Sequence, residues 1–187
     1  MLCLDNYFTG RKANIAQWIG HPRFELIRHD VTEPIKLEVD RIWHLACPAS
    51  PVHYQYDPVQ TTKTSVHGAI NLLGLAKRTG ATIRQASTSE VYGSAQKLPI
   101  NEAHPLNAQS PYAATKIAAD QLSLSYHKAY DLPVTIIRPF NTFGPRQSMR
   151  AAIPSIISQV INNNKSIKVG NIKTRRDFTY VEDTVMG

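Results

Sequence analysis

The 187-residue sequence has few of the features that stabilise secreted proteins or anchor membrane proteins. It contains only two cysteines, Cys3 and Cys47, and both stand in apolar runs. We interpret them as small hydrophobic side chains in a reducing compartment, since their context is not typical of a disulfide or a metal site. No apolar run approaches the roughly 18 residues of a membrane-spanning helix, and no signal peptide is recognisable. These features predict a cytoplasmic protein with no membrane partner and no metal.

Acidic residues are in the minority, 14 against 21 lysines and arginines, which leaves a net charge of +7. No basic run is longer than Arg175-Arg176, and no nucleic-acid-binding motif is recognisable, so we expect no nucleic-acid partner. The basic residues can form a solvated surface or a site for a diphosphate. We assign Arg146 and Arg176 to a diphosphate site and most of the others to the surface.

Glycine is also scarce: there are nine, and none belongs to a glycine-rich turn of the kind that holds a dinucleotide diphosphate at a helix N-terminus. The hydrophobic pattern nevertheless predicts alternating elements. Strands are expected at 1–5, 24–30, 41–47, 82–88, 133–138 and 166–170, and helices at 13–19, 57–78, 110–129 and 151–162. This order is typical of an α/β fold with a parallel sheet, in which 13–19 would cover one sheet face. Arg84 and Gln85 interrupt the continuous apolar pattern of a central parallel strand.

Tyr112 and Lys116 stand four residues apart in the predicted helix 110–129, so both side chains project from one helix face. Ser110 suits the N-cap of this helix and Pro111 its first turn. An ammonium near the phenol would lower the pKa of the tyrosine and produce a base for a sugar hydroxyl. Tyr-x-x-x-Lys alone is equally compatible with an ordinary amphipathic helix.

Four segments, taken in this order, favour a catalytic role for Tyr112 and Lys116. They are Ser87 to Gly93, Ser110 to Lys116, Arg138 to Arg146 and Arg176 to Asp183. From Leu2 to Asp183 the chain resembles the extended short-chain dehydrogenase/reductase family, which comprises nucleotide-sugar epimerases, dehydratases and decarboxylases. The resemblance implies a Rossmann-like doubly wound parallel sheet, NAD as cofactor and a nucleotide sugar, most often a UDP-sugar, as substrate. Residues 1–187 would form a partial NAD-binding domain that runs into the substrate-binding region after about residue 145. Full-length relatives usually form homodimers through the two long helices.

In that fold a glycine-rich turn and a central first strand precede the position of Asp5. Without them, the strands at 1–5 and 24–30 should be separated from the strand at 41–47, leaving unpaired strand edges. Relatives also continue beyond Gly187 into a substrate-binding region. By this comparison the chain is truncated at both ends, as an internal fragment or the product of a truncated gene.

Asp5 ends the first strand, where a carboxylate accepts hydrogen bonds from the adenosine ribose hydroxyls of a dinucleotide. The alternative is an acid that caps the helix near Arg11. The resemblance implies further cofactor contacts for Asp30, Leu45, Ala46, Lys63, Tyr112 and Lys116. Ser65 stands where the family usually has Asn. We therefore expect the cofactor contact that the Asn would make to be weaker or lost.

Tyr112 would deprotonate the sugar C4 hydroxyl while Thr88 hydrogen-bonds the same oxygen. By resemblance, Glu90 matches the family base and Ser89 stands where dehydratases carry an acid. The substrate diphosphate would be bound by Asn141, Arg146 and Arg176.

Different parts of the chain resemble different subfamilies. Residues 24–54 are similar to UDP-glucuronate decarboxylases, whereas residues 97–116 are more similar to 4,6-dehydratases and epimerases. The sequence therefore favours a nucleotide-sugar lyase that forms a 4-keto intermediate, with UDP-glucuronate decarboxylation first. Dehydration or epimerisation is the alternative. An inactive fragment that at most binds a nucleotide sugar or a partner chain is the alternative of another class.

Overall fold

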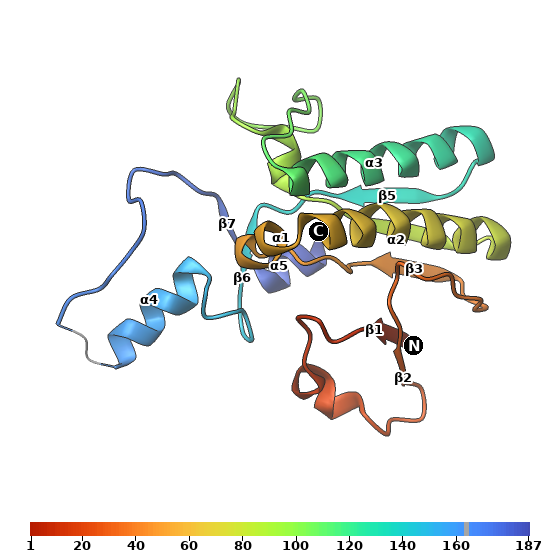
Figure 1. The fold of residues 1–187 in the computed structure, drawn as a ribbon, viewed down its shortest axis with the longest axis horizontal. Coiled ribbons are helices and arrows are strands. Elements are labelled where there is room, and N and C mark those ends of the chain that lie inside the picture. Colours follow the sequence, from red (N-terminus) through yellow and green to blue (C-terminus); the bar gives the residue numbers. More distant parts are fainter. Residues whose placement is uncertain (163–164) are drawn as a thin grey trace. The chain divides into compact units, whose positions relative to one another are not determined.

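The structure is a computed structural model that describes residues 1–162 and 165–187 (Figure 1). The chain forms two compact units, which we call unit 1 (Met1–Arg138) and unit 2 (Pro139–Gly187). Both combine helices with parallel strand pairs, which confirms the α/β class.

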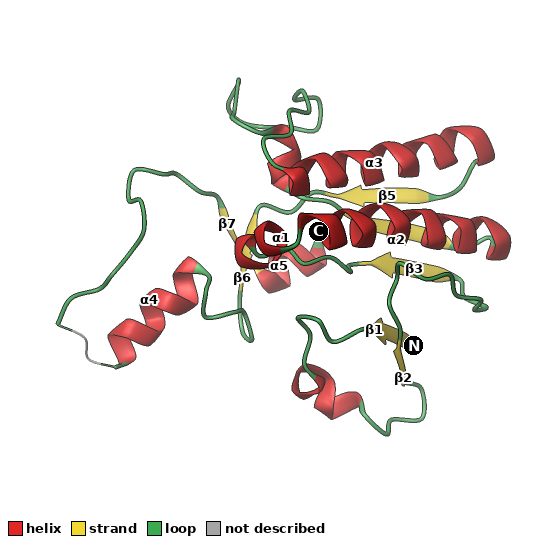
Figure 2. Cartoon of the chain, viewed as in Figure 1, coloured by secondary structure: helices red, strands yellow, loops and turns green. Residues whose placement is uncertain are grey.

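Unit 1 is built on a three-stranded parallel sheet in the order β3-β4-β5, formed by β3 (Arg41–His44), β4 (Thr82–Ala86) and β5 (Val134–Ile137). Helices α2 (Pro58–Thr79) and α3 (Pro111–Tyr130) lie side by side over one face of this sheet (Figure 2). Their facing side chains form the core with the inward residues of the strands. Leu73, Ala76, Ile83 and Ala119 are at most 1% exposed.

Both long helices begin and end with recognisable caps. The carboxylate of Asp57 accepts the first-turn amide of α2 at 2.8 Å, and α2 ends at Gly80 in the left-handed conformation, with φ of 74°. In α3 the Ser110 hydroxyl accepts the amide of Ala113 at 3.1 Å, and Pro111 follows the cap. The predicted start of the Tyr112 helix is therefore confirmed, because a side-chain acceptor replaces a missing helical partner.

No helix of unit 1 covers the other face of β3 and β4. There the guanidinium of Arg84 lies 4.6 Å from the centroid of the Trp43 ring, and Trp43 is 56% exposed. Gln85 points to the helix side instead and is fully buried. Arg84 therefore interrupts the apolar pattern because its face of β4 is not covered, whereas Gln85 is a polar residue on the covered face.

A second, two-stranded parallel sheet pairs β1 (Leu2–Asp5) with β2 (Glu25–Arg28). It shares no ladder with β3, as the sequence predicted for these strands. The segment predicted as a covering helix is instead the 3-10 helix η1 (Lys12–Trp18), in which no residue is buried. Its side chains align every third residue, and Gly20, with φ of 85°, turns the chain soon afterwards, so the prediction of a sheet-covering helix is wrong.

Two short elements complete unit 1, α1 (Pro51–Tyr56) and the 3-10 helix η2 (Ser89–Tyr92). Unit 2 contains the parallel pair β6 (Asn141–Phe143) and β7 (Phe178–Tyr180), with α4 (Ala152–Ile161) and α5 (Val181–Met186). The predicted strand at 166–170 is absent. The backbone of Lys168 bonds the side-chain amide of Gln159 instead, at 2.7 and 3.0 Å.

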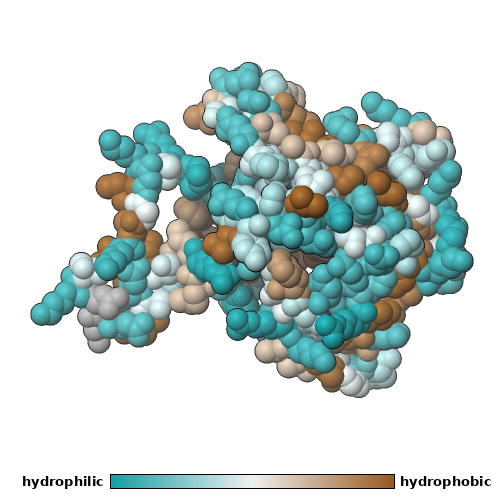
Figure 3. Space-filling model, in the orientation of Figure 1, coloured by the Kyte–Doolittle hydropathy of each residue, from teal (hydrophilic) through white to brown (hydrophobic). Residues whose placement is uncertain are grey.

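The visible surface is mainly hydrophilic, with separate hydrophobic areas between the polar ones (Figure 3). Some apolar side chains of α2 contribute to the surface, among them Val59 and Ile70, which are 63% and 44% exposed. Within the described residues, no helix has the length and apolarity needed to cross a membrane.

Candidate active site

Tyr112 and Lys116 lie on the first two turns of α3, against the chain segment that follows β4. They are 5% and 3% exposed, and the Lys116 ammonium lies 5.9 Å from the centroid of the Tyr112 ring. Thr88, the second residue after β4, hydrogen-bonds the Tyr112 phenol. The structure thus brings together the three side chains that the sequence proposed for the C4 hydroxyl.

The Lys116 ammonium is held by the backbone rather than by the phenol. It donates to the carbonyl oxygen of Ala86 at 2.9 Å and also hydrogen-bonds the Cys47 thiol. Burial lowers the pKa of Lys116, while Cys47 and the Asp120 carboxylate act in the opposite direction. The Lys116 side chain is therefore fixed at the end of β4, close to Tyr112.

Burial raises the pKa of Tyr112, whereas the sequence predicted that it is lowered. Desolvation is the largest cause, Cys47, Glu90 and Tyr54 add to it, and only the hydrogen bond with Thr88 opposes it. The prediction is wrong because water is excluded from the phenol and the Lys116 ammonium donates to a backbone carbonyl.

Two residues of this site had no assigned role in the sequence. The Tyr54 ring of α1 stacks on Tyr112, with centroids 4.7 Å apart and an interplanar angle of 7°. Cys47, placed with the buried apolar residues by sequence, is half-buried, and its sulfur lies 3.2 Å from the Ser65 hydroxyl. Neither contact has a sequence signal, since each joins segments that are distant along the chain.

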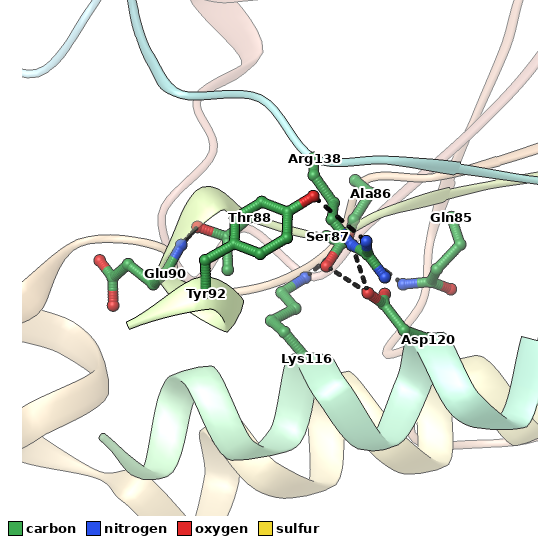
Figure 4. Close-up of polar contacts among 9 residues, drawn as sticks. All are labelled: Gln85, Ala86, Ser87, Thr88, Glu90, Tyr92, Lys116, Asp120 and Arg138. Atoms are coloured by element: carbon green, nitrogen blue, oxygen red, sulfur yellow. Dashed lines mark hydrogen bonds and ion pairs between the residues drawn. The ribbon is translucent and has the colours of Figure 1, made fainter. Parts of the chain in front are cut away.

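Ser89 and Glu90 begin η2, directly after Thr88. Figure 4 shows Thr88 and Glu90 side by side at this turn. The Thr88 hydroxyl caps this helix by accepting the amide of Glu90 at 3.2 Å. Ser89 is half-buried and Glu90 is exposed. Glu90 therefore lies at the surface next to the catalytic turn, where its proposed role as a base stays a prediction.

A second group of polar residues lies at the carboxyl ends of β1 and β2. The Asp5 carboxylate accepts the amide of Tyr7 at 2.6 Å, so Asp5 does not cap η1. Asn6 donates to the Asp30 carboxylate at 3.0 Å and links the two strand ends. Backbone hydrogen bonding from Thr32 lowers the pKa of Asp30, which keeps this carboxylate charged.

The remaining cofactor residues suggested by the family resemblance are less enclosed. Leu45 follows β3 and is 66% exposed, and Ala46 next to it is half-buried. Lys63 is exposed on the second turn of α2. Their contacts with a cofactor stay predictions.

The proposed diphosphate residues all belong to unit 2. The Asn141 amide donates to the carbonyl oxygen of Asp177 at 3.0 Å. Arg146 is exposed, with φ of 67°, and Arg176 is exposed on the segment before β7. Their assembly with Tyr112 into one site stays a prediction, since they belong to a different unit.

The described residues fit the two ends of a dinucleotide. Charged carboxylates stand at the ends of β1 and β2, where an adenosine ribose is recognised in parallel α/β sheets. Thr88, Tyr112 and Lys116 supply hydrogen-bonding groups around a buried centre suited to the reacting end. The described chain offers no glycine-rich turn for the diphosphate between these ends.

Comparison with known proteins agrees with this geometry. A model of the GDP-mannose 4,6-dehydratase family matches residues 4–187. UDP-glucuronic acid decarboxylase 3 of Arabidopsis thaliana is 49% identical over 98% of the chain and 56% of its own length. UDP-glucuronic acid decarboxylase 1 of the same plant is 47% identical over 100% of the chain and 45% of its own length. The chain thus spans about half the length of these curated relatives.

Solved structures with the same fold include epimerases. UDP-N-acetylglucosamine 4-epimerase from Methanobrevibacter ruminantium aligns with a TM-score of 0.90 and 28% identity, over 99% of the chain and 62% of its own. UDP-glucuronic acid 4-epimerase from Bacillus cereus, solved with UDP-glucuronic acid and NAD, aligns with a TM-score of 0.86 and 27% identity, over 98% and 62%.

The decarboxylase similarity covers 98–100% of the chain, so it includes the segments whose motifs resemble dehydratases. The family resemblance inferred from the motifs is confirmed. The chain belongs to the GDP-mannose 4,6-dehydratase family, a family of NAD-dependent epimerases and dehydratases.

Proposed function

We propose that the chain carries the catalytic centre of an NAD-dependent nucleotide-sugar lyase that acts through a 4-keto intermediate, with UDP-glucuronate as substrate. The observation that carries this proposal is the identity of 47–49% to UDP-glucuronic acid decarboxylases over nearly the whole chain. The assembly of Thr88, Tyr112 and Lys116 in one buried site supports it independently.

In the proposed reaction the Tyr112 phenolate accepts the proton of the C4 hydroxyl, and Thr88 holds the same oxygen by a hydrogen bond. NAD, when bound, accepts the hydride of C4 and later returns it. Because the oxidised C4 is a ketone, a carboxylate on C5 becomes a β-keto acid. The bond between C5 and the carboxylate then breaks, carbon dioxide leaves, and the electron pair passes to the C4 oxygen as an enolate. A proton from solvent adds to C5 and restores the C4 ketone. Hydride then returns to C4, and the C4 oxygen takes its proton back from Tyr112.

Because burial raises the pKa of Tyr112, the phenol is protonated at neutral pH in this structure. Stronger stabilisation of the phenolate is therefore needed in the complex, and Lys116 is the nearby cation that can provide it. Its ammonium would have to share its donors between Ala86 and the reacting groups. The Asp5 and Asp30 carboxylates would bind the adenosine end.

The alternative is epimerisation or dehydration of a nucleotide sugar. The fold similarity to two 4-epimerases, with TM-scores of 0.90 and 0.86, supports it. Epimerisation needs neither Ser89 nor Glu90, only rotation of the keto sugar. Dehydration of a 6-hydroxy sugar needs an acid and a base, for which Ser89 and Glu90 are the candidates. A serine hydroxyl is a poor proton donor at neutral pH, so Ser89 does not favour dehydration.

We also propose that the chain forms a homodimer, as the two long helices α2 and α3 lie next to each other on one side of unit 1. Light scattering coupled to size-exclusion chromatography would give a mass close to twice 20.9 kDa. A monomeric mass across micromolar concentrations would contradict this.

The function is tested by titrating the 187-residue chain with NAD in a calorimeter and then supplying UDP-glucuronate labelled in its carboxyl carbon. Release of labelled carbon dioxide that Tyr112→Phe abolishes, and that Tyr56→Phe preserves, would support the decarboxylase. Tyr56 is a suitable control because it is 88% exposed. Formation of the 4-epimer without carbon dioxide would establish the alternative. A folded chain that binds neither NAD nor the nucleotide sugar would overturn both.

A further inference from the structure

A buried ion pair between Asp120 and Arg138 lies next to the turn that contains Thr88. Arg138 is the first residue of the segment 138–146 discussed above, but neither residue has been assigned a role. Asp120 is fully buried on α3, and the side chain of Arg138, at the end of β5, is 16% exposed. The Asp120 carboxylate accepts the Nε of Arg138 and the hydroxyl of Ser87, both at 2.9 Å (Figure 4). Arg138 also donates to the Tyr92 hydroxyl at 3.2 Å. We call these four residues the ion-pair cluster.

The ion-pair cluster and the catalytic pair share one face of α3. Tyr112, Lys116 and Asp120 follow one another at intervals of four residues, so they lie in a row along the helix. Lys116 bonds the carbonyl of Ala86, and Asp120 bonds the side chain of Ser87. Successive turns of α3 therefore hold successive residues at the end of β4, and Thr88 is the next residue along that strand end.

Arg138 holds the far side of the same turn. Its guanidinium presents separate N–H groups in a planar fork, one toward Asp120 and one toward Tyr92. Tyr92 is the last residue of η2, which begins directly after Thr88. The turn that contains Thr88, Ser89 and Glu90 is thus bonded at its start through Ser87 and at its end through Tyr92.

The ion-pair cluster is better suited to fixing the orientation of this turn than to stabilising the fold. Burying an ion pair costs desolvation free energy that its attraction barely offsets, and apolar residues of similar volume often stabilise a core equally well. Desolvation raises the pKa of Asp120, and the hydrogen bonds from Arg138 and Ser87 oppose this. What apolar residues cannot supply is a set of directional bonds to both ends of one turn.

We propose that Asp120 and Arg138 are positioning residues of the catalytic turn, which fix Thr88 against Tyr112 and Lys116 through Ser87 and Tyr92. The chemical purpose of this positioning rests on the proposed function. The positioning itself is a property of the unliganded chain and can be measured without substrate.

The first measurement is amide hydrogen exchange of the unliganded chain by NMR. Two mild variants weaken the ion-pair cluster without leaving a buried charge unpaired. Ser87→Ala removes one hydrogen bond to the Asp120 carboxylate. Arg138→Lys keeps the positive charge but lacks the planar guanidinium that bonds both Asp120 and Tyr92. Both should speed exchange at the amides of Ser87 and Glu90 roughly tenfold, the effect of one bond to a charged group. The amides of α2 should keep their rates. Asp131→Asn, at the exposed C-cap of α3 and outside the ion-pair cluster, is the control substitution and should have no effect on these amides.

The second measurement follows the side-chain ammonium resonance of Lys116 with pH, assigned by its loss in Lys116→Met. In Asp120→Asn the ammonium loses a nearby carboxylate, so it should titrate at lower pH than in the wild type. Asp131→Asn should leave the titration unchanged. This shift tests the electrostatic contact between Asp120 and Lys116, whereas the local exchange pattern at Ser87 and Glu90 separates positioning from a role limited to stability.

Exchange that accelerates by one common factor throughout unit 1, or that does not change at Ser87 and Glu90, would overturn the proposal. An unshifted Lys116 titration in a folded Asp120→Asn chain would overturn it as well. Failure of the proposed function has a different signature, since the wild-type chain would then release no carbon dioxide while the exchange pattern stayed as expected.

Discussion

The burial of His44 predicts a pH dependence of folding that can be calculated from the structure. His44 ends β3 and is 2% exposed, and neither ring nitrogen has a hydrogen-bond partner within the described residues. Desolvation, with a smaller contribution from the Lys116 ammonium, lowers the pKa of His44 from 6.5 to about 3. The folded chain therefore keeps this imidazole neutral at pH values where an unfolded chain protonates it.

The free energy of unfolding should fall as the pH drops below 6.5 and should continue to fall toward pH 3, because only the unfolded state binds this proton in that range. Each pH unit corresponds to about 1.4 kcal/mol for one group. Between pH 6.5 and pH 5 the loss is therefore about 2 kcal/mol, a large part of the stability of a small domain. Above pH 6.5 His44 should contribute no further pH dependence.

Urea unfolding at pH 7 and pH 5, followed by tryptophan fluorescence, measures this loss. His44→Gln removes the titrating ring and should decrease the difference between the two pH values by about 2 kcal/mol, whatever its effect on stability at pH 7. His67→Gln is the matched control, since His67 is exposed on α2 and should leave the difference unchanged. A wild-type pH difference that persists in His44→Gln would refute the reasoning, as would an imidazole of His44 that titrates above pH 6 by NMR.

Other substitutions test the packing and capping of unit 1 by the same unfolding measurement. Leu73→Ala, at a fully buried position, should cost about 2–5 kcal/mol, whereas Leu98→Ala, at a position that is 76% exposed, should change stability by less than about 0.5 kcal/mol. Asp57→Ala should cost about 1 kcal/mol because the α2 N-cap loses its acceptor, and Asp57→Ser should recover most of it. Gly93→Ala should destabilise by about 1–3 kcal/mol, since φ is 64° and a loop carbonyl oxygen occupies the space of the new methyl group. Gly74 lies within α2, and a methyl group added there would meet no neighbouring atom. Gly74→Ala should therefore raise the free energy of unfolding by about 0.5–1 kcal/mol, and a loss of stability would contradict the helix assignment.

Local sequence rules predicted the parts of the site that depend on one element. The spacing of Tyr112 and Lys116, the Ser110 cap and the turn after β4 all follow from helix periodicity and strand ends, and the structure has each of them. The separation of β1 and β2 from β3 was also predictable, since it follows from strand order alone.

Properties that depend on contacts between distant segments were not predictable. The direction of the Tyr112 pKa shift is set by burial, to which the stacked ring of Tyr54 contributes. The Ala86 carbonyl oxygen accepts from Lys116 of α3, 30 residues away, and also from the buried side-chain amide of Gln85 at 3.2 Å. Such pairings have no signature in the spacing of residues along the chain.

The position of Arg138 also determines where the chain can be cut. Unit 1 ends at this residue, and its guanidinium neutralises the buried carboxylate of Asp120. An expression fragment that stops at Ile137 would retain the acid without its counter-charge, and such an orphaned charge costs about 3–5 kcal/mol. A fragment that stops a few residues later keeps both charges, so the smallest soluble piece suitable for NMR or crystallisation should include Arg138 and a short tail.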